Sequence, residues 1–300
     1  MLAFNRSSEK VISTFGKPVH VFSIEDSNNI DEVTVKSFGE EWLKFNSFSK
    51  EDIDQIGEDY FDILPKSLES SSTKALDLGC GTGRWAYYLS RKVGFIECVD
   101  PSDAVYAATS LLKDIPNVRI SRADVDTIPF DDNSFDLVYS LGVLHHIPDT
   151  SAAMAQCVKK VKPKGYFLVY LYYNLDNRGT SYKMLFHLSN IFRKGISKMP
   201  PKAKKLVCDF IALSVYYPFA KTSALVNGIG LRKVARKLPL AYYSDKSFWI
   251  MKNDALDRFG TPLEQRFSKK QILKMMSDCG LSNITFSERA PYWHAIGQKI

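Results

Sequence analysis

The stretch ALDLGCGTGRW, residues 75–85, decides the fold of this chain. A short apolar strand pattern, KALDL, ends in Gly79, Gly81 and Gly83 and leads into a helical pattern, GRWAYYLSRK. Glycines at such a turn let the backbone approach a ligand closely, because no Cβ atom stands in the way. The turn alone does not identify the ligand, since dinucleotide-binding enzymes and several other classes share it.

The spacing of the glycines disfavours two common ligands. A dinucleotide site has the pattern Gly-x-Gly-x-x-Gly, and counting from Gly79 its last position is occupied by Arg84. A P-loop for nucleotide phosphates carries Gly-Lys-Ser/Thr, and no such triplet follows here. Neither a dinucleotide site nor a P-loop is therefore predicted.

Strand and helix patterns alternate from Lys74 to Tyr173, which predicts a parallel sheet built from repeated strand–helix units. After a break of about ninety residues the pattern resumes with one helix and two strands, NITFSE and PYWHAIGQK. The predicted domains are an N-terminal helical cap at 1–73, a core at 74–175 and 265–300, and a basic helical insertion at 176–264.

Three aspartates stand at the ends of three successive predicted strands: Asp77, Asp100 and Asp124. Asp100 occupies the position where sheets of this kind bind two ribose hydroxyls, and one carboxylate can accept from both. Asp124 can accept from an adenine amine while Val125 flanks the ring. Three carboxylates attract a cationic adenosine ligand and repel a pyrophosphate, which favours S-adenosylmethionine over NAD.

Residues 74–173 resemble the core of the class I S-adenosylmethionine-dependent methyltransferases, in their small-molecule branch. LDLGCGTG resembles the first motif of that family, VDPS the second-strand acid, ADVDTIPFDDNSFDLVYS the third and fourth motifs, and LHHIPD a loop common in that branch. The resemblance implies a doubly wound, Rossmann-like, seven-stranded sheet with an antiparallel last strand. It also implies that the cofactor is held by Asp77, Gly79, Gly81, Gly83, Asp100, Asp124, Val125 and Ser140.

The fourth predicted strand is followed by His145 and His146, at the place where a methyl acceptor approaches. Methyl transfer from a sulfonium gains much of its rate from positioning, and a base is needed only when the acceptor is a hydroxyl or a protonated amine. Histidine suits that role, but one member of such a pair often packs or hydrogen-bonds locally. The sequence leaves both histidines as candidates.

Aromatic and charged residues outside the motifs are candidates for contacts with the acceptor. Trp42, in FGEEWLKF, either closes over the cofactor or anchors a helix to the core. The other candidates are Tyr173, Trp249, Arg258, Arg266 and Trp293. FGEEWLKF and the closing stretch are also similar to uncharacterised methyltransferases of polysaccharide gene clusters, which suggests a saccharide or a lipid-linked glycan as the acceptor.

The charge of the chain is concentrated in one segment. The net charge is +7, yet Arg178 to Leu238 alone contain thirteen Lys or Arg and one acid, Asp209. The apolar stretch LVCDFIALSVYYPFA lies between basic runs, which suits either a lid over the acceptor or a contact with an anionic membrane. Nucleic acid is disfavoured, because the Asn/Asp-Pro-Pro-Tyr/Phe motif of amino-methylating enzymes is missing after the fourth strand.

Composition narrows the class of protein further. The five cysteines form no close pair, which favours neither a disulfide framework nor a zinc site, and no metal is expected. No stretch has the length of an apolar membrane span, so we expect a cytoplasmic protein, with peripheral membrane association as an option. The predicted activity is transfer of a methyl group to an O or N of a small molecule. Methylation of a carbon in a quinone-like or lipid acceptor, other chemistry with the same cofactor, and non-catalytic binding of S-adenosylmethionine remain alternatives.

Overall fold

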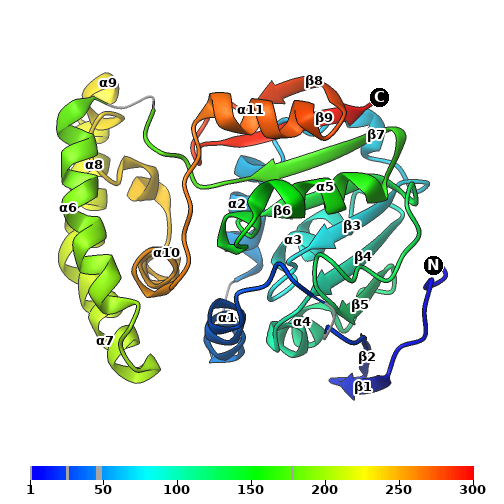
Figure 1. The fold of residues 1–300 in the computed structure, drawn as a ribbon. Helices are drawn as coiled ribbons and strands as arrows, with labels where there is room; N and C mark the ends of the chain where they lie inside the picture. Colours follow the sequence, from blue (N-terminus) through cyan, green and yellow to red (C-terminus); the bar gives the residue numbers. More distant parts are fainter. Residues whose placement is uncertain (1, 25–26, 45–48, 177–178) are drawn as a thin grey trace. The chain divides into compact units, whose positions relative to one another are not determined.

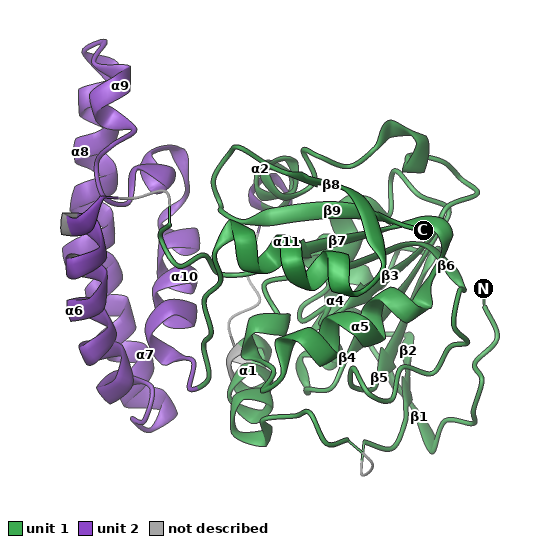
Figure 2. Cartoon of the chain, turned by 45° about the horizontal axis from the view of Figure 1, so that its top comes forward, with its two compact units in different colours: residues 1–46, 53–176, 263–300 green, residues 47–52, 177–262 purple. Residues whose placement is uncertain are grey.

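The computed structural model describes residues 2–24, 27–44, 49–176 and 179–300. It divides into unit 1, residues 1–46, 53–176 and 263–300, and unit 2, residues 47–52 and 177–262 (Figure 2). Residues 177 and 178, at the start of the predicted basic insertion, lie outside the described residues.

One nine-stranded sheet forms the centre of unit 1 (Figure 1), in the order β1-β2-β5-β4-β3-β6-β7-β9-β8. The strands are β1 (Lys10–Thr14), β2 (Lys17–Val21), β3 (Lys74–Leu78), β4 (Phe95–Asp100), β5 (Val118–Arg122), β6 (Phe135–Leu141), β7 (Val161–Tyr170), β8 (Leu281–Phe286) and β9 (His294–Lys299). The pairs from β2 to β7 are parallel, and β9 is antiparallel to both β7 and β8. The Rossmann-like parallel sheet and its antiparallel last strand are confirmed.

The sheet has nine strands where seven were predicted, because β1 and β2 of the predicted N-terminal helical cap add to it. β1 and β2 form a hairpin, and β2 adds to the sheet in parallel beside β5. The hairpin turn consists of Phe15 and Gly16, both with positive φ, the backbone that tight hairpins prefer. Val19 and Val21 are buried. These alternating residues mark a strand, but no local signal shows that its partner is β5, about one hundred residues away.

Helices cover both faces of the sheet. In unit 1 these are α1 (Glu32–Lys44), α2 (Lys50–Tyr60, whose first turn belongs to unit 2), α3 (Arg84–Leu89), α4 (Ala104–Leu112), α5 (Thr150–Lys160) and α11 (Lys269–Asp278), with short 3-10 turns η1 (Lys66–Leu68) and η2 (Leu144–His146). From β3 the chain continues through α3 to β4 and through α4 to β5. From β6 it continues through α5 to β7, which is the opposite direction along the sheet. Right-handed connections therefore place α5 on the face opposite to α3 and α4. α11 packs beside α5, and α1 packs on α4.

Strand β3 divides its side chains between the two faces. Leu76 and Leu78 belong to the large core cluster with Met154 of α5 and Ile272 of α11. The alternation of a strand turns Asp77 to the opposite face. There it lies level with Cys98 of β4 and Tyr139 of β6. A carboxyl group is thus placed among apolar neighbours close to the end of the central strand.

Unit 2 is helical. It contains α6 (Thr180–Ile196), α7 (Pro201–Ile211), a π-helical turn η3 (Ala212–Tyr216), α8 (Tyr217–Gly228), α9 (Arg232–Ala235), the 3-10 helix η4 (Ala241–Asp245) and α10 (Phe248–Gly260). α7, η3 and α8 follow one another without a break, and the wider π turn directly precedes Pro218, which lacks an N–H to donate. α6, α7 and η3 pack against α10. None of the helices in the described ranges is long and apolar enough to cross a membrane.

Candidate active site

The glycine turn after β3 needs glycine for two different reasons. Gly79, Gly81 and Gly83 all have positive φ, at 76°, 52° and 80°. A Cβ atom on Gly79 would lie 2.4 Å from the Val143 side chain, and one on Gly83 would lie 2.6 Å from Leu112. A Cβ atom on Gly81 would meet nothing within 4 Å. Gly79 and Gly83 therefore allow close packing, whereas Gly81 faces open space that a ligand can enter.

We expect Gly79→Ala and Gly81→Ala to have different consequences. Gly79→Ala combines a strained backbone with a clash, so the free energy of unfolding should fall by about 1–3 kcal/mol or more. Gly81→Ala bears the strain without the clash, so it should destabilise less while its methyl group obstructs the ligand. Thermal unfolding and calorimetric titration with the ligand measure the two effects. An equal loss of stability in both variants would contradict this division.

Asp100, at the end of β4, is tied to the glycine turn. Its Oδ2 accepts from the Gly81 N–H at 2.9 Å, and its Oδ1 accepts from the Ser102 N–H at 2.8 Å and the Ser102 hydroxyl at 2.6 Å. Burial raises the pKa of Asp100, and the donors at Ser102 and Gly81 act in the opposite direction. The carboxylate is thereby held at the strand end in a fixed orientation, with lone pairs left to accept from a ligand.

Asp124 both caps a turn and keeps one oxygen available. Its Oδ1 accepts from the Thr127 N–H at 2.8 Å, the Thr127 hydroxyl at 2.6 Å and the Asp126 N–H at 3.0 Å. Its Oδ2 is buried, and no group in the described ranges bonds to it. The neighbouring Val125 is buried in the core cluster. The bonds to Oδ1 orient the Asp124 side chain and leave Oδ2 to accept a hydrogen bond from a ligand.

Asp77 is the least satisfied acid of the sheet. It is fully buried, and across the described part of the chain no hydrogen bond of normal geometry reaches either of its carboxyl oxygens. Burial raises the pKa of Asp77 well above its ordinary value, while the Tyr139 phenol and the Arg84 guanidinium act in the opposite direction. An unsatisfied buried acid costs free energy, and a cationic ligand nearby would offset that cost.

Ser140 has a structural contact within the sheet. Its hydroxyl donates to the Leu78 carbonyl at 2.9 Å and so links β6 to the last residue of β3. The side chain is fully buried. Ser140 thus holds together the two strands that carry the glycine turn and the histidine pair.

Trp42 of α1 contacts Arg84, the residue that follows the glycine turn. The Arg84 guanidinium lies 5.0 Å from the centre of the Trp42 ring and 4.7 Å from that of Trp85. Arg84 is the first residue of α3, directly after Gly83. These cation–π contacts connect α1 to the turn, so Trp42 is near the cofactor side of the predicted site.

The two histidines of η2 have different surroundings. His146 Nδ1 lies 2.6 Å from the Leu263 carbonyl oxygen, and its ring makes an edge contact with Phe38. His145 is fully buried against Tyr172, with ring centres 3.9 Å apart, and neither of its nitrogens has a hydrogen-bond partner among the residues described. Burial lowers the pKa of His145 well below its ordinary value, and His146 and Arg266 add to that shift. His145 is therefore a neutral imidazole whose buried nitrogens lack a hydrogen-bond partner within the described ranges.

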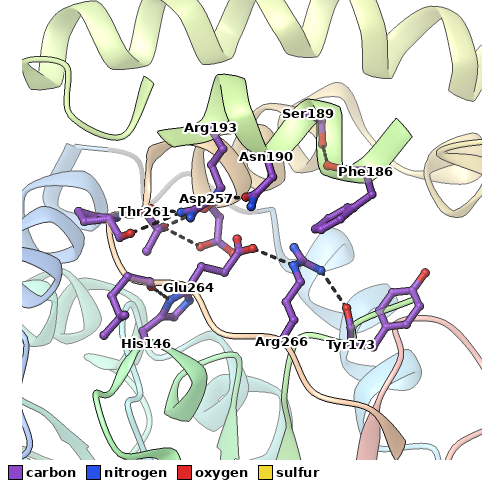
Figure 3. Close-up of polar contacts among 12 residues, drawn as sticks. His146, Tyr173, Phe186, Ser189, Asn190, Arg193, Asp257, Thr261, Glu264 and Arg266 are labelled. Atoms are coloured by element: carbon purple, nitrogen blue, oxygen red, sulfur yellow. Dashed lines mark hydrogen bonds and ion pairs between the residues drawn. The ribbon is translucent and has the colours of Figure 1, made fainter. Parts of the chain in front are cut away.

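The segment from Leu263 to Phe267 fixes this histidine loop (Figure 3). The Gln265 N–H donates to the His145 carbonyl at 3.0 Å, and its side-chain amide donates to the Ile147 carbonyl at 2.7 Å. The Phe267 N–H donates to the Tyr172 carbonyl at 2.8 Å. The loop carrying His145 and the ring that covers it are thus held by one short segment.

Arg266 and Tyr173 were both predicted as acceptor contacts. The Arg266 side chain contacts the backbone of Tyr173. Arg266 donates to the Tyr173 carbonyl at 3.1 Å and pairs with Glu264 at 2.8 Å, as Figure 3 shows. The Tyr173 ring makes edge contacts with Tyr292 and Trp293. The Trp293 indole N–H donates to Asp176 at 2.9 Å, and its ring belongs to the buried core. These contacts give Tyr173 and Trp293 a packing role.

Trp249 and Arg258, the remaining predicted acceptor contacts, lie on α10 in unit 2. The Arg258 guanidinium lies 4.5 Å from the centre of the Phe186 ring. Lys252 lies 5.7 Å from the Trp249 ring. Within the described ranges, no group of three His, Cys, Asp or Glu side chains could hold a metal ion.

A further histidine, which was not predicted from the sequence, is buried at the carboxyl end of β7, where β9 begins. His294 of β9 places Nε2 2.7 Å from Asp62 Oδ1 and Nδ1 2.9 Å from the Pro291 carbonyl. Both ring nitrogens thus face oxygen atoms. Tyr60 lies against His294, Tyr170 and Trp85. A histidine within an apolar strand is the one sequence signal that could have indicated this cluster.

The comparisons with known proteins agree with this geometry. Residues 76–169 match the family described as "Methyltransferase domain". The chain is 35% identical over 127 residues to the mitochondrial arginine-hydroxylase NDUFAF5 of Mus musculus, covering 42% of this chain and 35% of that protein. It is 34% identical over 107 residues to the demethylmenaquinone methyltransferase of Staphylococcus saprophyticus, covering 34% of this chain and 46% of that enzyme. The chain thus spans less than half the length of these curated relatives.

Two solved structures share the fold. One is a complex between the Haloferax volcanii Trm112 methyltransferase activator and a putative methyltransferase, with a TM-score of 0.50 at 12% identity over 88% of this chain and 97% of that chain. The other is a putative O-methyltransferase from Nostoc punctiforme, with a TM-score of 0.50 at 13% identity over 86% of this chain and 60% of that chain. At these identities the likeness concerns the fold alone.

Proposed function

We propose that this chain is a class I S-adenosylmethionine-dependent methyltransferase with its core at residues 76–169, and that it methylates a hydroxyl or amine of a small molecule. The observation that carries the proposal is His145, a buried neutral imidazole whose nitrogens have no partner within the described part of the chain. A base of this kind is needed when the acceptor must lose a proton, as a hydroxyl does.

The residues of the glycine turn fit S-adenosylmethionine as the cofactor. Gly81 opens onto free space, and Asp100 and Asp124 each present a fixed acceptor to a ligand. Asp77 is a buried acid whose charge a cationic ligand would stabilise. When bound, the cofactor supplies a methyl group on a sulfonium. Asp100 would hold the ribose, Asp124 the adenine amine, and Asp77 the positively charged portion.

His145 acts on the acceptor in this proposal. Either ring nitrogen can take the proton of an attacking hydroxyl as the bond from its oxygen to the methyl carbon forms and the bond from that carbon to sulfur breaks. For an ammonium acceptor, the ring nitrogen takes the proton first, and the resulting amine then attacks. Tyr172 holds the imidazole plane by stacking, and Gln265 holds its backbone. The full burial of the ring keeps bulk water away from the nitrogens, so the acceptor must displace neighbouring side chains to reach the base.

We infer that the acceptor carries several hydroxyl groups, with a saccharide or a lipid-linked glycan as the leading class. Hydroxyl groups need the base that His145 offers. Aromatic side chains near it, Tyr170 and Tyr172, supply flat apolar surfaces against which a sugar ring can pack. The similarity of FGEEWLKF to enzymes of polysaccharide gene clusters supports the same class.

Methylation of a ring carbon in a quinone-like acceptor is the second candidate. Tyr60, Trp85 and Tyr170 form consecutive ring contacts, with centres 4.6 and 5.0 Å apart, that could flank a planar ring. The relative from Staphylococcus saprophyticus is named as a demethylmenaquinone methyltransferase. Deprotonation of a quinol hydroxyl by His145 would activate the ring carbon beside it, so the same base serves either acceptor.

Two measurements test the proposal. Calorimetric titration should show binding of S-adenosylmethionine and none of NAD, and tighter binding of NAD would overturn it. A screen of glycan and quinol acceptors should then reveal release of S-adenosylhomocysteine with one class. NMR of the product made with a ¹³C-labelled methyl donor distinguishes O-, N- and C-methyl groups. Cofactor binding without release on any acceptor would favour non-catalytic binding.

A further inference from the structure

Unit 2 exposes far more apolar surface than unit 1. Of the 22 large apolar side chains that are exposed in the described part of the chain, sixteen belong to unit 2, although that unit is less than a third of the chain. Soluble proteins rarely leave contiguous apolar patches of this extent open to water, and such patches usually mark an interaction surface. The distribution of these residues along the helices shows how the surface is built.

On α6 the exposed apolar residues share one face. Met184, Leu188, Ile191 and Phe192 follow the spacing i, i+4, i+7, i+8. The buried Arg193 belongs to the other side, where it donates to the Thr261 carbonyl at 2.9 Å, just beyond the end of α10 (Figure 3). α6 therefore turns its polar anchor toward α10 and its apolar face toward water, the reverse of an ordinary surface helix.

The continuous helix formed by α7, η3 and α8, called the long rod below, repeats this arrangement. Cys208, Ala212, Tyr216 and Ala220 form a buried stripe, and the last three pack with Met251 and Ala255 of α10. The other side of the rod carries exposed apolar residues at i, i+4, i+7 and i+11: Leu206, Phe210, Leu213 and Tyr217. Two alanines and Tyr216 of the rod thus serve the packing inside unit 2, while other large apolar residues of the rod face outward.

Basic side chains flank the apolar face at both ends of the long rod. Lys194, Lys198 and Lys202 precede or begin it and are exposed. Four more exposed basic residues follow its end: Arg232, Lys233, Arg236 and Lys237. The rod runs from Pro201 to Gly228 and is about 40 Å long at 1.5 Å per residue. An apolar strip with cationic ends suits a helix that lies flat at a lipid interface.

We propose that the apolar faces of α6 and the long rod form a docking surface for an anionic lipid bilayer. The apolar side chains enter the boundary between head groups and acyl chains, and the basic ends bind lipid phosphates. A second copy of this chain fits less well, because it would bring together two segments that each carry +12 between residues 178 and 238. Nucleic acid would use the basic ends but would leave the apolar face open to water.

Membrane docking goes beyond the proposed methyl transfer and does not depend on it. If both hold, the acceptor is presented at the membrane, as a lipid-linked glycan or a quinol would be. Failure of docking would leave the cofactor site untouched. Failure of methyl transfer would likewise leave vesicle binding unchanged, so the two results are separable.

Co-sedimentation of residues 1–300 with vesicles tests the surface. Vesicles of phosphatidylcholine with 30 mol% phosphatidylglycerol should pellet the protein, and pure phosphatidylcholine vesicles should bind at least tenfold more weakly, roughly the effect of one or two basic contacts. The triple variant Leu206→Gln, Phe210→Gln, Leu213→Gln should bind the anionic vesicles at least tenfold more weakly than the unaltered chain. So should the variant in which Arg232, Lys233, Arg236 and Lys237 are all Gln.

Matched controls come from unit 1. Val11→Gln with Phe15→Gln changes two exposed apolar residues, and Lys66→Gln, Lys113→Gln, Lys164→Gln and Lys270→Gln change four exposed lysines. Both controls should bind vesicles as the unaltered chain does. Circular dichroism and titration with S-adenosylmethionine establish that each variant is folded. Equal binding to both kinds of vesicle, or no loss in the triple variant, would overturn the proposal. So would a dimer in light scattering that the triple variant abolishes.

Discussion

Replacement of His145 by alanine should lower kcat by about 10²- to 10⁴-fold while the affinity for S-adenosylmethionine stays the same. The physical reason is that His145 is a buried neutral imidazole whose two nitrogens have no partner in the described residues. Loss of this ring removes the proton acceptor but none of the groups around the glycine turn. Kinetics of S-adenosylhomocysteine release, with calorimetry of cofactor binding, measure the two quantities.

His146→Ala is the matched control for His145→Ala. His146 holds the Leu263 carbonyl through Nδ1, so its loss should loosen the loop and lower kcat by a smaller factor. The pH dependence adds a second readout. Because burial lowers the pKa of His145, the unaltered enzyme should keep its activity below pH 6.5, where an ordinary histidine would be protonated. Equal losses in both variants, or a fall in activity centred near pH 6.5, would contradict the assignment.

Asp77→Asn should weaken binding of S-adenosylmethionine at least tenfold and yet stabilise the unliganded protein at pH 7. Hydrogen bonds and ion pairs with a charged partner contribute about 1.5–3 kcal/mol, and this is the binding free energy that Asp77→Asn should lose. Without the ligand, the same carboxyl group is a buried acid that lacks a hydrogen bond of normal geometry among the described groups, and its replacement by a neutral amide should raise the free energy of unfolding by about 1–3 kcal/mol.

The sign of the pH effect follows from the direction of the shift. Burial holds the pKa of Asp77 above its ordinary value of 3.8, so between these two values the folded chain keeps a proton that the unfolded chain releases. The contribution of Asp77 to the unfolding free energy of the unliganded protein therefore decreases as pH rises above about 4, and Asp77→Asn should remove this contribution. Thermal unfolding at several pH values measures it.

Glu97→Gln is the control for Asp77→Asn. Glu97 is equally buried on β4, but it pairs with Arg119, whose nitrogens lie 2.5 and 2.8 Å from its carboxylate. The same change of acid to amide there weakens an ion pair without touching the glycine turn. Cofactor affinity should therefore stay unchanged in Glu97→Gln. Unchanged affinity in Asp77→Asn as well would show that Asp77 does not face the ligand.

The sequence predicted those parts of the site that depend on neighbours along the chain. The glycine turn and the acids at the strand ends lie within short motifs, so their pattern was sufficient to indicate the class of ligand. The two histidines could not be told apart, because the Leu263 carbonyl that binds His146 comes from 117 residues away. The pair of His294 and Asp62, separated by 232 residues, was not predicted for the same reason.

The fold shows the same limit. The alternating residues of β2 indicate a strand, but its place beside β5 is set by tertiary packing, so the nine-stranded sheet was not predicted. In unit 2 the sequence showed a stretch that is apolar on all sides. The side that is covered depends on tertiary contacts, because it is the side on which Ala212 and Ala220 pack against α10.

The position of β9 has a consequence for synthesis of the protein. β9 lies between β7 and β8 and pairs with both, although it follows them in the chain. Until residues 294–299 have left the ribosome, β7 keeps one open edge and β8 has no strand to pair with. Open strand edges can pair with other chains. We therefore expect the nascent protein to depend on β9, or on a chaperone, to avoid aggregation.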